Sequence, residues 1–152
     1  MKIGIILPCH NIEKQINVAA FLYFLKHHSK FHLCFINNGS FDKTKMILEK
    51  IKRDAAREVS IIDIKKKKNK VAVIRAGIRY LNSRIDLGAI ELVEIDYGIK
   101  YSELKTIFFN VLERNNKNTH QKTYGLDVFE KKMGNSRIRI LLLLLILKTL
   151  YL

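Results

Sequence analysis

The chain alternates between two kinds of hydrophobic segment. Short, nearly unbroken apolar runs are typical of strands buried in a parallel sheet. Four runs of this kind occur, at residues 3–7, 32–36, 59–64 and 89–95, and a weaker one lies at 123–128. Between them, apolar residues recur every three or four positions, which predicts amphipathic helices. The predicted helices cover residues 12–26, 43–57, 71–81, 102–114 and 136–152.

Two of these helices have a clear predicted apolar face. In the first helix, the spacing selects Ile16, Ala19, Ala20, Tyr23 and Phe24. In the second helix, it selects Met46, Ile47, Ile51 and Ala55. Asp42 is the expected N-cap of the second helix, because a short acidic side chain before a helix can accept a hydrogen bond from its first N–H groups.

Strand and helix follow one another at the spacing of strand–helix–strand units. This order predicts an α/β fold with a parallel-dominated sheet and helices on both faces. In such sheets, ligands bind at the carboxyl ends of the strands. The segments that follow the strands are therefore the places to look for a site: residues 8–11, the turn-like cluster 37–40, the basic loop 65–70, and 94–98.

Length and composition predict one globular domain. A chain of 152 residues is long enough to bury a real hydrophobic core. Its 48% hydrophobic and 28% charged residues are ordinary for a globular protein, and one proline and seven glycines argue against a disordered or fibrous chain. Cys9 and Cys34 lie in or beside apolar runs, so we expect small core residues rather than a disulfide or a metal pair.

The formal net charge of +14 predicts attraction to anions such as phosphorylated small molecules, acidic lipids or nucleic acid. A plainer interpretation is that the many lysines are simply solvated, and the run 65–68 fits that interpretation better than a nucleic-acid patch. Nucleic-acid binding is disfavoured, because the sequence has no basic stripe interleaved with aromatic residues and no recognisable major-groove motif.

The two ends of the chain lead to different expectations. The N-terminus opens on an apolar strand without the pattern of a signal peptide, so we expect a cytoplasmic protein. Residues 140–147 form an unbroken apolar run that is too short to span a bilayer. Because a large apolar stripe needs a cover, we expect residues 138–152 to pack on a protein partner or to lie on a membrane surface.

Four loop sequences, in order, resemble those of family 2 glycosyltransferases. Residues 8–13 read Pro-Cys-His-Asn-Ile-Glu, similar to the family's Pro-x-Tyr/His-Asn-x-Glu. Residues 37–44 read Asn-Asn-Gly-Ser-Phe-Asp-Lys-Thr, where the family has Asp-Asp-Gly-Ser-x-Asp-x-Thr. Residues 68–78 resemble Asn-Lys-Gly-Lys-Ala-x-Ala-x-Arg-x-Gly-Ile, and Glu-Ile-Asp at 94–96 resembles the Asp-x-Asp motif. Each match is weak alone, but four in order after successive predicted strands are fairly specific.

The resemblance covers residues 2–114 well and 123–139 loosely. It implies a GT-A-like (Rossmann-like) nucleotide-sugar-binding domain over residues 1–135, followed by the apolar helix 136–152. The family's domain normally continues well past this length, and the later part supplies the acceptor-side wall and the catalytic base. On this resemblance the domain is incomplete, and no residue of the chain is assigned as the base.

The resemblance implies binding of a nucleotide-diphosphate sugar, expected to be UDP-linked, and transfer of the sugar to an acceptor hydroxyl in polysaccharide or lipid-linked glycan synthesis. The implied nucleotide-sugar contacts are Pro8, Asn11, Glu13, Asn37, Asn38, Gly39, Ser40, Lys70, Arg75 and Glu94. Asp96 is the implied ligand of Mg²⁺ or Mn²⁺. The residue types suit these roles, because amides bond to a base or ribose, cations to phosphate, and a carboxylate to a hard cation.

Each of these residues also has a plainer interpretation. Asn11 would serve as a helix N-cap and Asn38 as a turn former, while the charged residues would be solvated. The departures from the family pattern are Asn37 and Asn38 for its acidic pair, Glu94 for its first Asp-x-Asp acid, and Asn69 for a glycine, where asparagine tolerates a left-handed turn. They support a second hypothesis: a truncated, catalytically impaired relative that acts as a binding module or is a non-functional fragment.

Overall fold

The computed structural model describes residues 2–55, 57–95 and 101–117. Strands and helices alternate in the predicted order: β1 (Lys2–Cys9), α1 (Val18–His27), β2 (Phe31–Asn38), α2 (Thr44–Asp54), β3 (Val59–Ile64), α3 (Lys70–Arg84), β4 (Leu87–Leu92) and α4 (Tyr101–Lys117). The predicted strand at 123–128 and the predicted helix at 136–152 lie outside the described residues, as does the surface expected at 138–152.

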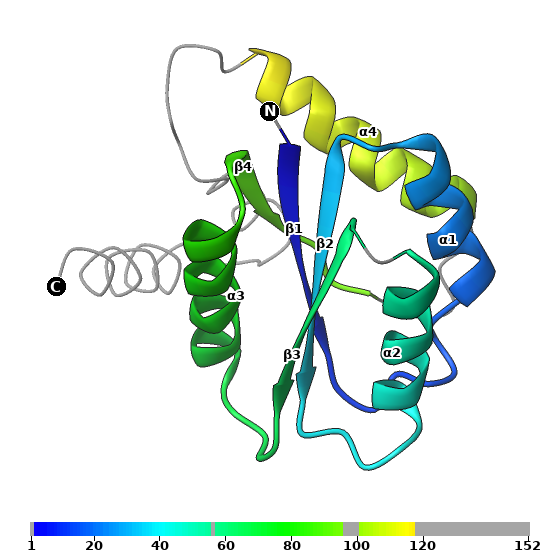
Figure 1. Cartoon of the computed structure of the whole chain (residues 1–152), viewed down its shortest axis with the longest axis vertical. Coiled ribbons are helices and arrows are strands. Elements are labelled where there is room, and N and C mark those ends of the chain that lie inside the picture. Colours follow the sequence, from blue (N-terminus) through cyan, green and yellow to red (C-terminus); the bar gives the residue numbers. More distant parts are fainter. Residues whose placement is uncertain (1, 56, 96–100, 118–152) are drawn as a thin grey trace, which may run out of the picture.

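The four strands form one sheet in the order β3-β2-β1-β4, and every neighbouring pair is parallel (Figure 1). This confirms the predicted α/β fold with a parallel sheet. The register aligns Cys9 of β1 with Asn37 of β2, and Asn37 with Asp63 of β3. The carboxyl ends of three strands therefore meet at one edge of the sheet.

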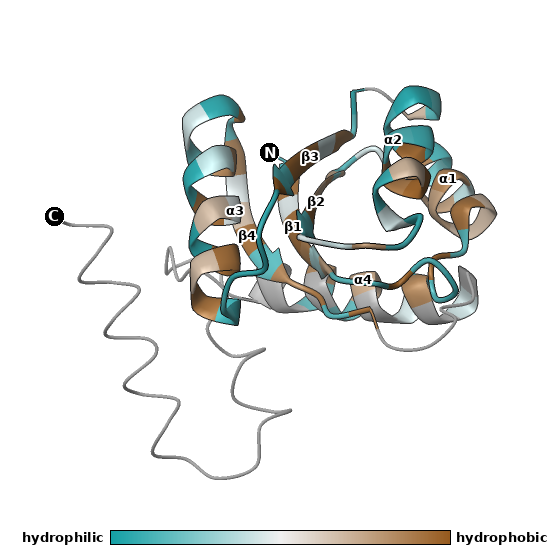
Figure 2. Cartoon of the chain, turned by 90° about the horizontal axis from the view of Figure 1, so that it is seen from below, coloured by the Kyte–Doolittle hydropathy of each residue, from teal (hydrophilic) through white to brown (hydrophobic). Residues whose placement is uncertain are grey.

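Helices cover both faces of the sheet. The helix α3 packs on one face, where an aliphatic core includes Ile6, Ile36 and Leu81. The helices α1, α2 and α4 cover the other face, as Figures 1 and 2 show. That second core is rich in aromatic rings, and its fully buried members include Phe21, Phe24, Phe31, Phe35 and Phe108. Strands buried on both sides explain the unbroken apolar runs of the sequence.

The predicted first helix begins too early. Helix α1 starts at Val18, because the Asn17 side chain accepts a hydrogen bond from the Ala20 N–H at 3.0 Å and caps the helix there. The N-cap alternative for Asn11 is therefore wrong. The predicted face is partly wrong as well: Ala19 and Tyr23 are exposed, while the buried residues of α1 are Ala20, Phe21, Phe24 and Leu25.

The predicted face of the second helix also needs correction. Its buried residues are Thr44, Leu48 and Ile51, whereas Met46 is 65% exposed. Lys43 occupies the N-cap position in place of Asp42. Asp42 lies one residue earlier, and its carboxylate accepts a hydrogen bond from the Thr44 N–H at 3.0 Å. The predicted acid is therefore engaged at the start of the helix, but not as its N-cap residue.

Two strand ends differ from the sequence-based prediction. Asn37 and Asn38 are the last residues of β2 rather than part of a turn. The strand β4 ends at Leu92, although Val93 and Ile95 beyond it remain buried. Asn69 is not left-handed but extended, with φ −67°, and caps α3 by accepting a hydrogen bond from the Ala72 N–H.

The expectation for the cysteines is confirmed. Cys9 and Cys34 are both free and buried. Burial raises the pKa of the Cys34 thiol to about 12 and raises the pKa of Cys9 as well, so both are neutral core side chains at physiological pH. In the part of the chain that the structure describes, no helix combines the length and the apolar character needed to cross a membrane.

Candidate functional site

Three loops follow the aligned strands at the carboxyl edge: the first loop (residues 10–17), the second loop (39–43) and the third loop (65–69). Most of the residues predicted to bind nucleotide sugar lie in the first two loops or in the strand ends that lead to them: Pro8, Asn11, Glu13, Asn37, Asn38, Gly39 and Ser40. The tertiary structure therefore brings together residues that lie about 30 positions apart in the sequence.

The first and second loops are joined by hydrogen bonds between side chains and backbone. The Asn11 N–H donates to Ser40 Oγ at 3.1 Å, and Asn11 Oδ1 accepts from the Phe41 N–H at 2.9 Å. Glu13 Oε2 accepts from the Lys43 N–H at 2.8 Å. Asn11 takes up a positive φ of 51°, which asparagine tolerates better than most residues. These predicted ligand residues thus hold the two loops together.

Asp42 and Thr44 complete the junction between the two loops. Asp42 Oδ2 accepts from the Glu13 N–H at 3.1 Å, and Thr44 Oγ1 accepts from the Ile12 N–H at 2.9 Å. Burial raises the pKa of Asp42. The hydrogen bonds from Thr44 and from the Glu13 N–H together lower it by more, so the net shift of the pKa is downward. The carboxylate is therefore ionised at neutral pH and holds these N–H groups in place.

The second and third loops are joined through Asn38 and Gly39. The Asn38 side chain donates to the Lys68 carbonyl at 2.9 Å and accepts from the Lys68 N–H at 2.8 Å, so one amide matches both backbone groups. Gly39 has φ +63°, and a Cβ there would lie 2.6 Å from the Lys67 nitrogen. Only glycine allows both the positive φ and the close approach of the Lys67 backbone. The position of the third loop therefore depends on Gly39 and on the Asn38 hydrogen bonds.

The third loop carries four consecutive lysines, at 65–68, and all four are exposed. Lys70, the first residue of α3, forms an ion pair with Glu94, which follows β4. The structure therefore joins two predicted site residues that the sequence separates. Arg75 lies further along α3, and its Nε is buried without a hydrogen-bond partner among the described residues.

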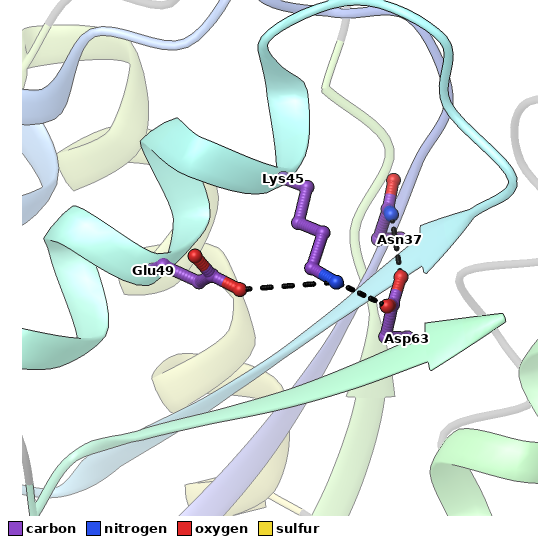
Figure 3. Close-up of polar contacts among 4 residues, drawn as sticks. All are labelled: Asn37, Lys45, Glu49 and Asp63. Atoms are coloured by element: carbon purple, nitrogen blue, oxygen red, sulfur yellow. Dashed lines mark hydrogen bonds and ion pairs between the residues drawn. The ribbon is translucent and has the colours of Figure 1, made fainter. Parts of the chain in front are cut away.

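A second polar cluster links β2, β3 and α2 (Figure 3). Asn37 Nδ2 donates to Asp63 Oδ1 at 2.7 Å, and Lys45 Nζ donates to Asp63 Oδ2 at 2.7 Å. Glu49, one helical turn along α2, forms an ion pair with Lys45, with Oε1 at 4.0 Å from Nζ. Hydrogen bonds from Lys45 and Asn37 lower the pKa of Asp63, so its carboxylate is charged at neutral pH.

Sequence reasoning missed Asp63, Lys45 and Phe41. The signal for Asp63 was an acid in the otherwise apolar carboxyl half of a predicted strand. Lys45 gave no signal, because exposed lysines are common at helix starts. Phe41 occupies a variable position of the loop pattern, yet its side chain is 89% exposed beside His10, with ring centroids 6.2 Å apart. An aromatic ring left in water at this edge is available for stacking on a flat ligand.

The described residues do not by themselves form a metal site. They contain no group of three or more His, Cys, Asp or Glu side chains placed to hold a metal ion. Glu94 offers one carboxylate, already paired with Lys70. The predicted metal ligand, Asp96, lies outside the described residues. The fit to Mg²⁺ or Mn²⁺ is therefore partial, because one carboxylate supplies too few oxygen ligands for either cation.

Neither a protein family nor a curated protein matches the sequence. Solved structures of S. aureus TarS, a glycosyltransferase, do match the fold. TarS 1–349 aligns at 21% identity and TM-score 0.52, over 74% of this chain and 33% of that one. A second TarS structure aligns at 19% identity and a TM-score of 0.52, and the alignment covers 74% of this chain and 20% of TarS. TarS 1–349 in complex with UDP-GlcNAc aligns at 19% identity and a TM-score of 0.51, and the alignment covers 74% of this chain and 32% of that one.

The chain thus spans about a third or less of the length of the TarS structures that it matches. At this level of identity the likeness concerns the fold. The parallel sheet with flanking helices is common to both proteins, and the chain has the GT-A-like, Rossmann-like α/β fold of these glycosyltransferase structures.

Proposed function

We propose that this chain binds a UDP-linked sugar at the carboxyl edge of its sheet and acts in the transfer of the sugar to an acceptor hydroxyl of a polysaccharide or lipid-linked glycan. The observation that carries the proposal is the set of three loops, hydrogen-bonded to one another at the edge where parallel α/β sheets bind ligands. A TarS structure of the same fold was solved in complex with UDP-GlcNAc.

The chemistry of this edge suits a nucleotide diphosphate. The exposed lysines at 65–68 supply positive charge for the phosphates. The exposed ring of Phe41 offers a stacking surface for the base. The glycine turn at Gly39 brings the backbone of the second and third loops into contact without side-chain bulk. Charge, an aromatic surface and an open backbone thus lie on connected loops.

A divalent cation, Mg²⁺ or Mn²⁺, is part of the proposal. Asp96 would hold it, with Glu94 contributing a second carboxylate once its ion pair with Lys70 is exchanged. Such a cation neutralises the charge that develops on a diphosphate leaving group. The chain's own contribution would be to hold the diphosphate in place through Lys70 and the lysines of the third loop.

A second candidate function is a binding module that turns over slowly or not at all. Asn37 and Asn38 stand where the resembling family has two acids, and their amides are engaged by Asp63 and by the Lys68 backbone. Binding without transfer would follow if those acids are needed for the reaction. Robust sugar transfer by the purified chain to any acceptor would exclude this candidate.

Calorimetric titration of the full chain with UDP, with and without Mn²⁺, tests the proposal. We expect metal-dependent binding that Asp96→Ala abolishes. Asp86→Ala is the matched control, since Asp86 is exposed just before β4, at the opposite end of the sheet. Equal binding with and without Mn²⁺ would remove the metal and keep the nucleotide site. No binding of UDP, GDP, CDP or ADP would refute the site itself.

A further inference from the structure

The cluster around Asp63 leaves one hydrogen-bond acceptor without a donor among the described residues. Asn37 Nδ2 is used by Asp63, and its Oδ1 points the other way (Figure 3). That oxygen has no partner among the described residues, although Asn37 is only 3% exposed. A buried acceptor left unpaired is costly and marks a place where a donor is expected.

Asp63, beside Asn37, has acceptor capacity of its own that a ligand can use. Each of its oxygens accepts one hydrogen bond, from Asn37 and from Lys45, and each keeps a further lone pair. Its side chain is 35% exposed, so a ligand can reach it. Two neighbours on different elements fix its orientation, which gives the carboxylate a defined direction in space.

An acid lies directly beside Asn37 in the neighbouring strand. In the sequence pattern the loop acid is replaced by Asn37, but the aligned residue of the neighbouring strand is an acid, Asp63. The amide at 37 can donate to that acid, which a carboxylate could not do. The negative charge of this pair therefore lies at the end of β3, and the end of β2 carries the neutral amide.

We propose that Asp63 selects the base of the bound nucleotide, which rests on the proposed function. A carboxylate accepts from a ring N–H next to a carbonyl, as in uracil and guanine. It repels cytosine and adenine, which present a ring nitrogen lone pair at the same place. Lys45, half exposed beside Asp63, donates to the base carbonyl. This pairing of acceptor and donor favours uracil or guanine, and their separate titration distinguishes the two.

The test is calorimetric titration of the full chain and of Asp63→Asn with UDP, GDP, CDP and ADP. We expect the natural chain to bind UDP or GDP at least about tenfold more tightly than CDP and ADP. In Asp63→Asn, we expect that preferred ligand to bind about 10- to 100-fold more weakly. CDP should bind equally well or better, because an amide can donate to the ring nitrogen of cytosine. A merely structural role would weaken all four ligands alike.

Asp54→Asn is the matched control, since it makes the same change at the far end of α2, where Asp54 is exposed. Thermal unfolding of each variant reports whether it folds. If Asp63→Asn does not fold, the selectivity of the natural chain still decides the matter. Equal affinity for all four nucleotides, or a preference for CDP or ADP, overturns the role of Asp63 while leaving the nucleotide site. Binding of none of them overturns both proposals.

Discussion

The polar groups at the two ends of the sheet differ in their burial and in the partners to which they bond. At the amino end, His32 of β2 and Ser60 of β3 share a buried hydrogen bond of 2.9 Å, and aromatic rings stack nearby. At the carboxyl end, polar side chains bond to the backbone of other loops, and lysines remain exposed. The same strands thus end in a closed, stabilising region on one side and an open, charged region on the other.

We expect the amino end of the sheet to contribute mainly to stability and the carboxyl end to ligand binding as well. His32 and Ser60 bond to each other within the fold, so changes there should alter folding and leave ligand binding to the folded protein intact. Groups at the carboxyl end hold loops in position, and the lysines at 65–68 remain exposed. Changes there should alter binding as well as stability. Substitutions at each end can test this division.

The largest effect is expected in the aromatic core. Phe108 is fully buried, with ring centroids 4.4 Å from Phe24 and 5.2 Å from Phe31. Phe108→Ala should lower the free energy of unfolding by about 3–5 kcal/mol, because it leaves a cavity. Its neighbour Phe109 is 46% exposed, so Phe109→Ala should cost less than about 1 kcal/mol. Denaturant unfolding measures both, and similar losses would contradict this view of the core.

A smaller effect is expected from Asn37→Asp, which restores the acid of the family pattern. The new carboxylate would face Asp63 where the amide now donates at 2.7 Å. We expect a loss of about 1–3 kcal/mol of unfolding free energy at neutral pH. The loss should shrink as the pH is lowered, because one carboxyl of such a pair takes up a proton.

The double variant Asn37→Asp/Asp63→Asn sharpens this prediction. It exchanges the amide and the acid, so one donor and one acceptor again face each other, and most of the lost stability should return. Denaturant unfolding of the two single variants and the double variant gives the coupling free energy. Strictly additive losses would show that the contact between residues 37 and 63 does not matter for folding.

The smallest effect is a pH dependence at the amino end. Burial lowers the pKa of His32 below 6.5, helped by the nearby charge of Lys2, although Glu58 opposes the shift. The unfolded chain therefore binds a proton more readily than the folded one. Stability is full above pH 6.5 and falls as the pH drops below it, by at most about 1.4 kcal/mol per pH unit for one proton.

Unfolding measured between pH 5 and 8 for the natural chain and for His32→Gln tests this sign. The variant should lose that part of the slope, because glutamine does not titrate in this range. A slope that is unchanged in His32→Gln would assign the pH dependence to other groups.

Much of the fold follows from local patterns. Nearly unbroken apolar runs identify the four strands, because both faces of the sheet are covered by helices. Their alternation with helices predicts the parallel sheet. The helix faces were less predictable: the start of α1 depends on Asn17, so Ile16 lies before the helix and could not mark its buried face.

The site was predicted as a set of positions rather than as a set of contacts. The loops after β1, β2 and β3 were correctly placed at one edge, because parallel strands point the same way. The sequence did not show that Asn11 and Glu13 bond to the second loop, or that Asn38 spans the Lys68 backbone. Those contacts depend on how closely two loops approach, and local patterns carry no information about such distances.

The amino-acid sequence by itself therefore determined the order and type of elements, since these depend on local spacing of apolar and polar residues. The tertiary structure alone decided which polar residues meet. Asn37 and Asp63 lie 26 positions apart, and only the register of β2 and β3 makes them partners. Lys70 and Glu94 meet in the same way, because α3 begins beside the end of β4. Charge placement at the site is a property of packing, because it depends on distances between segments that are remote in the chain.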